Sequence, residues 1–239
     1  MNAAELIAKL EAMADPERAK AVARFFKCSP GEYGEGDQFR GIPVPTVRAA
    51  IRPFRSLALP EIDKVLQSPW HEDRLAALLL LVHQFERGDE GARKSTYDLY
   101  VQRFDRINNW DLVDTSAPQI VGGWLADRDR RVLTKWAKSP RLWTRRVAVL
   151  ATLFFIRQGD FDDILRLAAM LLDDREDLMH KAVGWMLREA GKRDESVLDA
   201  FLVEHCRAMP RTMLRYAIER LEPAKRERYM RGAVGDSSM

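Results

Sequence analysis

The chain has 239 residues, of which 46% are hydrophobic and 31% charged, with 39 Lys and Arg against 36 Asp and Glu. This ordinary soluble composition predicts an ample core, and no apolar run reaches the roughly 20 residues that cross a bilayer. Two cysteines and four histidines without motif spacing exclude a recognisable metal site and favour a reducing compartment. The N-terminus lacks the basic start of a secretion signal, so we expect a cytoplasmic protein that uses no membrane, metal or cofactor.

Helical signals cover nearly the whole chain. Apolar residues recur at three- and four-residue spacing, for example at Leu75, Leu78, Leu79 and Val82. Three dipeptides predict helix starts, with a capping residue followed by proline in the first turn: Asp15-Pro16, Ser68-Pro69 and Ser139-Pro140. Three glycines predict helix ends with a left-handed C-cap: Gly88, Gly159 and Gly191.

One segment interrupts the helices. Residues 29–45 hold four glycines and three prolines, a composition that excludes a helix. The stretch Gly34-Glu35-Gly36 predicts the turn of a small β-hairpin over residues 32–44, with Tyr33 and Phe39 on its strands. Its acids oppose an anion and no Gly-Lys-Ser/Thr follows, which argues against a phosphate-cradling loop. We therefore expect a structural or DNA-contacting hairpin.

The helical signals repeat along the chain. Ser68–Asp89 and Ser139–Asp160 both begin with Ser-Pro and end with Gly-Asp, and they are offset by 71 residues. A third copy lies in residues 180–194. This period, about twice 35, is typical of an α-solenoid of HEAT-like helical repeats, in which one face of the array is concave. We predict an all-α solenoid as a single domain over residues 1–232, with a flexible tail over 233–239; a globular all-α bundle is the alternative.

Positive charge is concentrated in two windows. Residues 128–146 contain eight Lys and Arg against one acid, and residues 205–231 contain eight against three acids. Such basic stripes are typical of proteins that bind the phosphate backbone of nucleic acids, although solvated helix faces of arginine-rich proteins also cluster by chance. Composition alone leaves these two interpretations open.

The segment Asn108–Asp114 combines an indole with two carboxylates. Asn109 or Asn108 is a natural N-cap, and Trp110 and Asp114 stand one helical turn apart on a common face. An uncompensated charge at Asp114 would be costly among apolar neighbours, so this acid is expected to have a partner or a task. An acid beside a large aromatic ring suits a positively charged substrate. The alternative for any single tryptophan is a packing role.

Three motifs in order give the chain a resemblance to a known family. They are Trp110-Asp111-Leu112-Val113-Asp114, Trp143-Thr144-Arg145-Arg146 and Lys181-Ala182-Val183-Gly184-Trp185-Met186-Leu187-Arg188-Glu189. Over most of its length the chain resembles the AlkD-like DNA alkylation repair proteins, HEAT-like solenoid DNA glycosylases that act on N3- and N7-alkylated purines.

The resemblance implies a role for each motif. Asp114 would stabilise the oxocarbenium-like sugar as the alkylated base departs, and it would position the attacking water. Trp110 and Trp185 would pack against the deoxyribose and add cation–π attraction. Arg146 would hold the phosphate beside the lesion, and the base would not be flipped into a pocket. The basic helix ends along the concave surface of the solenoid would bind the DNA duplex. Further DNA contacts are expected from the remaining motif positions: Trp143, Arg145, Lys181, Arg188, Phe25 and Lys27.

Two departures from the family pattern keep an alternative open. Where the family's glycosylases place a tyrosine, this chain has Phe25, within Ala23-Arg24-Phe25-Phe26-Lys27. The glycine-rich insertion looks like the hairpin of relatives that bind branched or distorted DNA without excising a base. The leading prediction is a monomeric, monofunctional DNA glycosylase that needs no metal or cofactor. The alternatives are a non-catalytic binder of branched or damaged DNA and, third, a protein-scaffolding solenoid.

Overall fold

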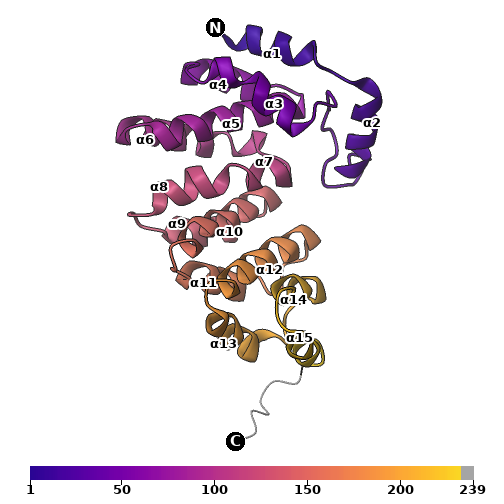
Figure 1. Ribbon diagram of the computed structural model, residues 1–239, viewed down its shortest axis with the longest axis vertical. Coiled ribbons are helices and arrows are strands. Elements are labelled where there is room, and N and C mark those ends of the chain that lie inside the picture. Colours follow the sequence, from indigo (N-terminus) through magenta and orange to yellow (C-terminus); the bar gives the residue numbers. More distant parts are fainter. Residues whose placement is uncertain (233–239) are drawn as a thin grey trace, which may run out of the picture. The chain divides into compact units, whose positions relative to one another are not determined.

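The structure is a computed structural model that describes residues 1–232, and its regular elements are helices (Figure 1). Within these residues no β-strand occurs, and a single isolated β-bridge joins Gln38 to Trp70. The all-α prediction is therefore confirmed. The chain divides into two compact units, Met1–Ile120 and Val121–Met239, called unit 1 and unit 2 below. The predicted single domain and concave surface stay predictions, and the predicted tail over residues 233–239 lies outside the described residues.

Unit 1 is built around one long helix. Its elements are α1 (Ala3–Glu11), α2 (Pro16–Phe25), α3 (Val44–Ala50), the 3₁₀ turn η1 (Arg52–Phe54), α4 (Leu59–Leu66), α5 (His71–Arg87), α6 (Glu90–Gln102), the 3₁₀ turn η2 (Phe104–Arg106) and α7 (Trp110–Asp114). The central helix α5 packs against α1, α3, α4, α6 and α7. A π-helical turn, η3 (Pro118–Gly122), follows α7 across the boundary between the units.

Unit 2 has two long central helices of 15 residues each. Its helices are α8 (Gly123–Leu125), α9 (Arg131–Ala137), α10 (Leu142–Ile156), α11 (Asp162–Met170), α12 (Asp177–Gly191), α13 (Glu195–His205), α14 (Arg211–Ala217) and α15 (Pro223–Met230). Helix α10 packs against α9, α11 and α12, and α12 packs against α11, α13 and α14. Because α5 and α10 are covered on several sides, their runs Leu75–Leu81 and Val147–Leu153 are buried at every position.

The register of the predicted repeat is visible in one arginine of each unit. Arg74 Nη1 donates to the carbonyl oxygens of Ser68 and Pro69 at 3.1 and 2.9 Å. Arg145 Nη1, 71 positions later, donates to the same two positions, Ser139 and Pro140, at 3.0 and 3.1 Å. The two units therefore share one local structure ahead of their central helices.

The same contacts correct two predicted helix starts. Ser68-Pro69 and Ser139-Pro140 do not begin a helix, because their carbonyl groups turn to the arginine while α5 and α10 begin at His71 and Leu142. Asp15 does cap α2, since its carboxylate accepts the N–H of Arg18 at 3.0 Å.

Of the three predicted glycine ends, one is left-handed. Gly159 has a φ of 81° and follows α10, as predicted. Gly88 ends α5 in an extended conformation with a φ of −76°, and Gly191 is the last residue of α12. At both of these positions the glycine permits close packing, because an added Cβ would lie within 2.8 Å of neighbouring atoms.

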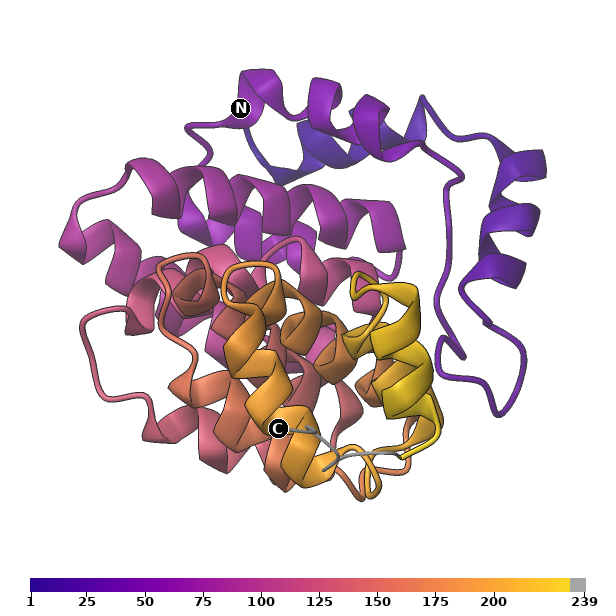
Figure 2. The same cartoon turned by 60° about the horizontal axis from the view of Figure 1, so that its bottom comes forward.

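The predicted β-hairpin over residues 32–44 is wrong. The loop between α2 and α3, residues 26–43, leaves one end of α2 and returns to α3 through successive turns (Figure 2). Its first part forms turns of its own, for example from the Gly34 N–H to the Lys27 carbonyl oxygen at 3.0 Å. Its last part is held by α5, where the Glu72 carboxylate accepts the N–H groups of Arg40, Gly41 and Ile42 at 2.8, 2.8 and 3.1 Å. Gly41 has a φ of 81°, and a Cβ there would lie 2.2 Å from the carbonyl oxygen of Asp15. The loop is thus bound to the starts of α5 and α2.

Candidate functional site

Helix α7 consists of the predicted motif Trp110–Asp114, and its start is fixed by side chains. The N-cap is Asn109, as predicted, whose side-chain oxygen accepts the N–H of Trp110 at 2.9 Å. The carboxylate of Asp111 accepts the N–H of Leu112 at 2.8 Å. Asn109 is fully buried, and its amide donates to Asp37 of the α2–α3 loop at 3.1 Å. The motif helix is therefore tied to a segment 72 residues away in sequence.

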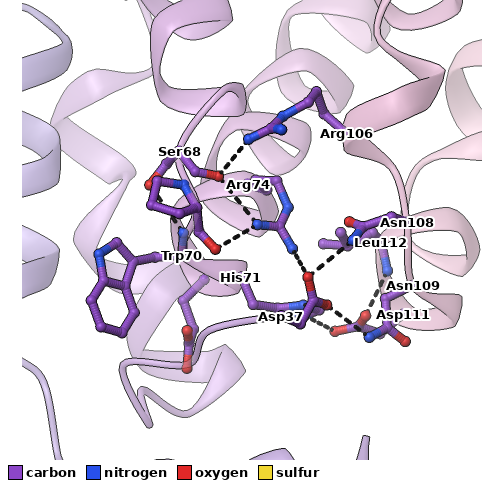
Figure 3. Close-up of polar contacts among 12 residues, drawn as sticks. Asp37, Ser68, Trp70, His71, Arg74, Arg106, Asn108, Asn109, Asp111 and Leu112 are labelled. Atoms are coloured by element: carbon purple, nitrogen blue, oxygen red, sulfur yellow. Dashed lines mark hydrogen bonds and ion pairs between the residues drawn. The ribbon is translucent and has the colours of Figure 1, made fainter. Parts of the chain in front are cut away.

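Asp37 is the centre of this connection (Figure 3). Its carboxylate is 3% exposed and accepts hydrogen bonds from Arg74 at 2.5 Å, Asn108 at 3.0 Å and Asn109 at 3.1 Å, while His71 Nδ1 lies at 3.3 Å. Burial alone would raise the pKa of Asp37, but the hydrogen bond from His71 and the charge of Arg74 outweigh it and lower the pKa to about 2. Asp37 is accordingly ionised.

His71 joins two carboxylates. Its Nδ1 faces Asp37, and its Nε2 lies 2.8 Å from Asp111. Burial would lower the pKa of His71, but the hydrogen bonds with Asp111 and Asp37 raise it to about 9. With an acceptor on each ring nitrogen, both nitrogens donate, so His71 is an imidazolium at neutral pH. It links the α2–α3 loop through α5 to α7.

The first turn of α5 contains four consecutive buried polar residues, His71 to Arg74, each between 0% and 3% exposed. Asp73 pairs with Arg40 of the loop in a bidentate contact of 2.8 and 3.0 Å, and Ser68 adds a hydroxyl at 2.7 Å. The Arg40 guanidinium also lies over the ring of Trp70, 4.8 Å from its centroid. Because a buried charge without a partner is costly, the loop is held to α5 at both Asp37 and Arg40.

An aromatic wall stands beside α7. The ring of Trp110 stacks on Phe26 at 5.1 Å and 18°, and Phe25 meets it edge-on at 6.0 Å. Phe26 in turn stacks on Phe39 of the loop at 5.1 Å. These rings line a cavity of about 610 Å³, whose wall also includes Thr115. We call it the aromatic cavity.

The predicted site residues of unit 1 meet at this cavity or near it. Phe25 is 67% exposed and lines it together with Trp110. Lys27 follows in an exposed position with a left-handed φ of 52°. Asp114 is half-buried at the end of α7, directly after the buried pair Leu112 and Val113.

In unit 2, Trp185 lies on α12 and donates from Nε1 to Glu189 at 3.3 Å. The preceding Gly184 brings α12 against α14, because a Cβ there would lie 2.4 Å from the carbonyl oxygen of Met213. Two predicted DNA contacts on this helix form ion pairs within the unit, Lys181 with Asp177 at 2.7 Å and Arg188 with Glu219.

The other predicted residues of unit 2 lie on α10. Arg145 holds Asp174 in a bidentate contact of 2.7 and 3.2 Å, so it fills the structural role that Arg74 fills in unit 1. Arg146 is 5% exposed and donates to the carbonyl oxygen of Leu178 at 2.7 Å. Trp143 is half-buried in the first turn. Since α10 and α12 pack against each other, the predicted site residues of unit 2 lie on two neighbouring helices. Their meeting with Trp110 and Asp114 of unit 1 stays a prediction.

Sequence reasoning missed the residues that hold α7, namely Asp37, His71 and Arg74. A signal was present in the polar quartet His71-Glu72-Asp73-Arg74, which directly precedes the apolar run Leu75–Leu81. A helix that is apolar on all sides is buried, so its first turn is buried too and its charges need partners.

Metal and membrane features are absent from residues 1–232. There, no group of three or more His, Cys, Asp or Glu side chains is arranged to hold a metal ion. None of the helices described in this range is long and apolar enough to cross a membrane.

Comparisons with known proteins give a family and a fold. Residues 6–221 match the model of a protein family described as DNA alkylation repair enzyme. One similar solved structure is a predicted DNA alkylation repair enzyme from Enterococcus faecalis, with 20% sequence identity and a TM-score of 0.71 over 88% of this chain and 98% of that one. At this identity the likeness shows a shared fold. Among curated protein sequences, none matches.

Proposed function

Because the chain belongs to the DNA alkylation repair enzyme family, we propose that it is a DNA glycosylase that hydrolyses the N-glycosidic bond of N3- or N7-alkylated purines in duplex DNA. The observation that carries the proposal is α7, a five-residue helix that bears Trp110 at its start and a half-buried Asp114 at its end. An indole and a carboxylate on one short, firmly held helix suit a reaction in which positive charge develops.

The proposed reaction requires electrostatic stabilisation of a positive charge that develops on the sugar. An N3- or N7-alkylated purine is already cationic, so it leaves as a neutral base without protonation by the protein. The positive charge passes to the sugar, where Asp114 stabilises the oxocarbenium-like transition state and orients the attacking water. Trp110, on the same helix, adds cation–π attraction to this charge. This reaction uses no metal or cofactor.

The buried charges of unit 1 support this proposal by holding α7 in place. Catalysis of this kind depends on groups that need no reorganisation when the charge appears. Asp111 is neutralised by His71, and Asn109 is anchored by Asp37, so the helix start cannot move without breaking buried ion pairs. Phe26 restrains the Trp110 ring by stacking.

A base-release assay tests the proposal. Duplex DNA that contains N7-methylguanine or N3-methyladenine is incubated with the protein, and the free base is quantified. Asp114→Asn should lower the release rate by about 10²–10³-fold, the usual loss when one electrostatic stabiliser is removed, and should leave DNA affinity nearly unchanged. The matched control is Asp105→Asn, since Asp105 is an exposed acid in η2. No release by the wild-type protein would end the glycosylase proposal.

A second candidate is a non-catalytic binder of branched or damaged DNA. The observation that favours it is Phe25, an exposed ring beside Trp110 at a position where a hydroxyl group is expected for glycosylase activity. Tight binding of a four-way junction, together with no base release, would support this candidate. A Phe25→Tyr variant that increases base release would favour the glycosylase.

A further inference from the structure

A second cavity of unit 1 is lined by positive charge. It has a volume of about 370 Å³, and three arginines from α3, η1 and the residue after η1 line it: Arg48, Arg52 and Arg55. It shares Thr115, the residue directly after Asp114, with the aromatic cavity. We call it the arginine pocket. The charge windows recognised in the sequence, residues 128–146 and 205–231, do not include it.

The three guanidinium groups are uncompensated. Among the residues that the structure describes, none of the three forms an ion pair or a side-chain hydrogen bond. The acid in the pocket wall is Glu86, and it has its own cation, Arg87, at 3.9 Å. Three positive charges therefore share one concave surface with a single acid, so the surface carries net positive charge although like charges repel one another.

Two further side chains offer donors to an incoming acceptor. Arg87 Nη1 lies 3.0 Å from His83 Nδ1; because an arginine can only donate, Nδ1 accepts and the proton of the neutral ring sits on Nε2. Burial and the charges of Arg87 and Arg55 lower the pKa of His83, which keeps the ring neutral. Gln119, also in the pocket wall, has a buried side-chain oxygen without a hydrogen-bond donor in the described part of the chain, so a ligand would break no hydrogen bond at that atom.

The backbone that carries the arginines is held in place. Gln84 of α5 donates to the carbonyl oxygens of Arg55 and Leu57 at 3.1 and 2.7 Å. On η1, the Phe54 ring is buried beneath the Lys9 ammonium, which lies 5.7 Å from its centroid. The pocket therefore exists before any ligand arrives, which lowers the entropic cost of binding.

We propose that the arginine pocket binds one phosphate group of the nucleic-acid backbone. Planar guanidinium groups match phosphate oxygens in bidentate contacts and stay charged at every physiological pH. Backbone contacts of this kind carry no sequence information, but they set the position of the duplex on the protein. Since Thr115 belongs to both cavities, a phosphate held here places the strand beside the aromatic cavity. The inference rests on the proposed DNA-directed function and adds the site that fixes the position of the DNA backbone on the protein.

The test measures affinity for an undamaged duplex by fluorescence anisotropy at several KCl concentrations. The variant Arg52→Gln/Arg55→Gln should bind about tenfold or more weakly, and the slope of log K against log [KCl] should become shallower by about one unit for each phosphate that the protein no longer binds. The charge-matched control Lys64→Gln/Lys94→Gln, which removes two exposed lysines of α4 and α6, should change neither quantity. Both arginines are exposed, so circular dichroism should show an unchanged fold.

A second variant, expected to bind DNA more tightly, excludes misfolding as the cause of the changes in affinity. Glu86→Gln removes the acid from the pocket wall and should tighten DNA binding by about two- to threefold, which a damaged protein would not do. Wild-type affinity and salt slope in the double arginine variant would overturn the proposal. The proposal would also be overturned if poly-glutamate bound as tightly as DNA and if this binding depended on Arg52 to the same extent. The site would then accept the carboxylates of proteins. Because the test uses undamaged DNA, its result does not depend on base release. A protein that binds this DNA through the arginine pocket but releases no base would contradict the glycosylase proposal and leave the phosphate site intact.

Discussion

Raising the pH from 6.5 to 9 is expected to remove about 3 kcal/mol from the free energy of unfolding, because His71 loses its proton in this range. The folded-state pKa of His71 is raised to about 9 from the ordinary 6.5. A raised pKa means that the stabilising contribution is complete below pH 6.5 and is lost as the pH rises through 9. Each pKa unit corresponds to about 1.4 kcal/mol, and the shift of His71 spans between two and three such units.

Other titrating groups can be separated from His71. The pKa of Asp37 is lowered to about 2 from 3.8, so its contribution is complete above pH 3.8 and is lost as the pH falls through 2. Burial, and then the charge of Asp37, raise the pKa of Cys28 to about 11, so Cys28 reduces stability mainly above pH 9. The lowered pKa of His83 adds stability as the pH rises past the ordinary 6.5, opposite in sign to His71. A His83→Gln/Cys28→Ser background removes both overlaps, and the range between pH 6.5 and 9 then reports on His71.

Urea unfolding followed by circular dichroism at pH 6.5, 7.5 and 9 measures the effect. The wild-type free energy should fall across the series, whereas His71→Gln should start lower and stay nearly flat. A wild-type free energy that does not change across this range would refute the assignment of His71 as an imidazolium between Asp37 and Asp111. The same would follow if His71→Gln lost as much stability with pH as the wild-type protein.

Two further substitutions test the packing of each unit. Arg40→Ala should lower the free energy of unfolding by about 3–5 kcal/mol, because Asp73 is left buried and unpaired; Arg40→Met combined with Asp73→Leu should restore most of it in urea melts. A loss under about 1 kcal/mol for Arg40→Ala would contradict the buried pair. Gly184→Ala should cost about 1–3 kcal/mol, because its Cβ would lie 2.4 Å from the Met213 carbonyl oxygen. Differential scanning calorimetry measures this, with Gly31→Ala, a left-handed position with open space, separating conformational strain from overlap.

Local features of the structure were predictable from the sequence. The helices, the Asn109 cap and the 71-residue repeat follow from periodicity and from capping chemistry between near neighbours. The loop over residues 26–43 shows where such reasoning fails. Its glycines and prolines resemble a hairpin, and it does form local turns, but the side chains that anchor it to α5 and to the start of α7 lie 32 and 72 positions away. No local pattern identifies such partners.

The candidate site shows the same division. Trp110 and Asp114 stand out because an indole and an acid in an apolar helix are unusual. The arginine pocket does not stand out, because exposed arginines spaced by three or four residues, such as Arg48, Arg52 and Arg55, normally cover a solvated helix face. Only the packing of α3 against α5, with η1 directly after α3, reveals that these charges share one concavity.

The pairing of Arg74 with Asp37 has a consequence for how this fold can be shortened or recombined. In unit 2 the equivalent arginine, Arg145, takes its acid from the segment after α11, whereas in unit 1 the acid comes from the inserted loop. Deleting the loop would remove Asp37 and Arg40 together and leave opposite charges stranded at the start of α5. The insertion is therefore an integral part of the unit, and a chimaera that exchanges this loop must carry an acid and an arginine at the same two places.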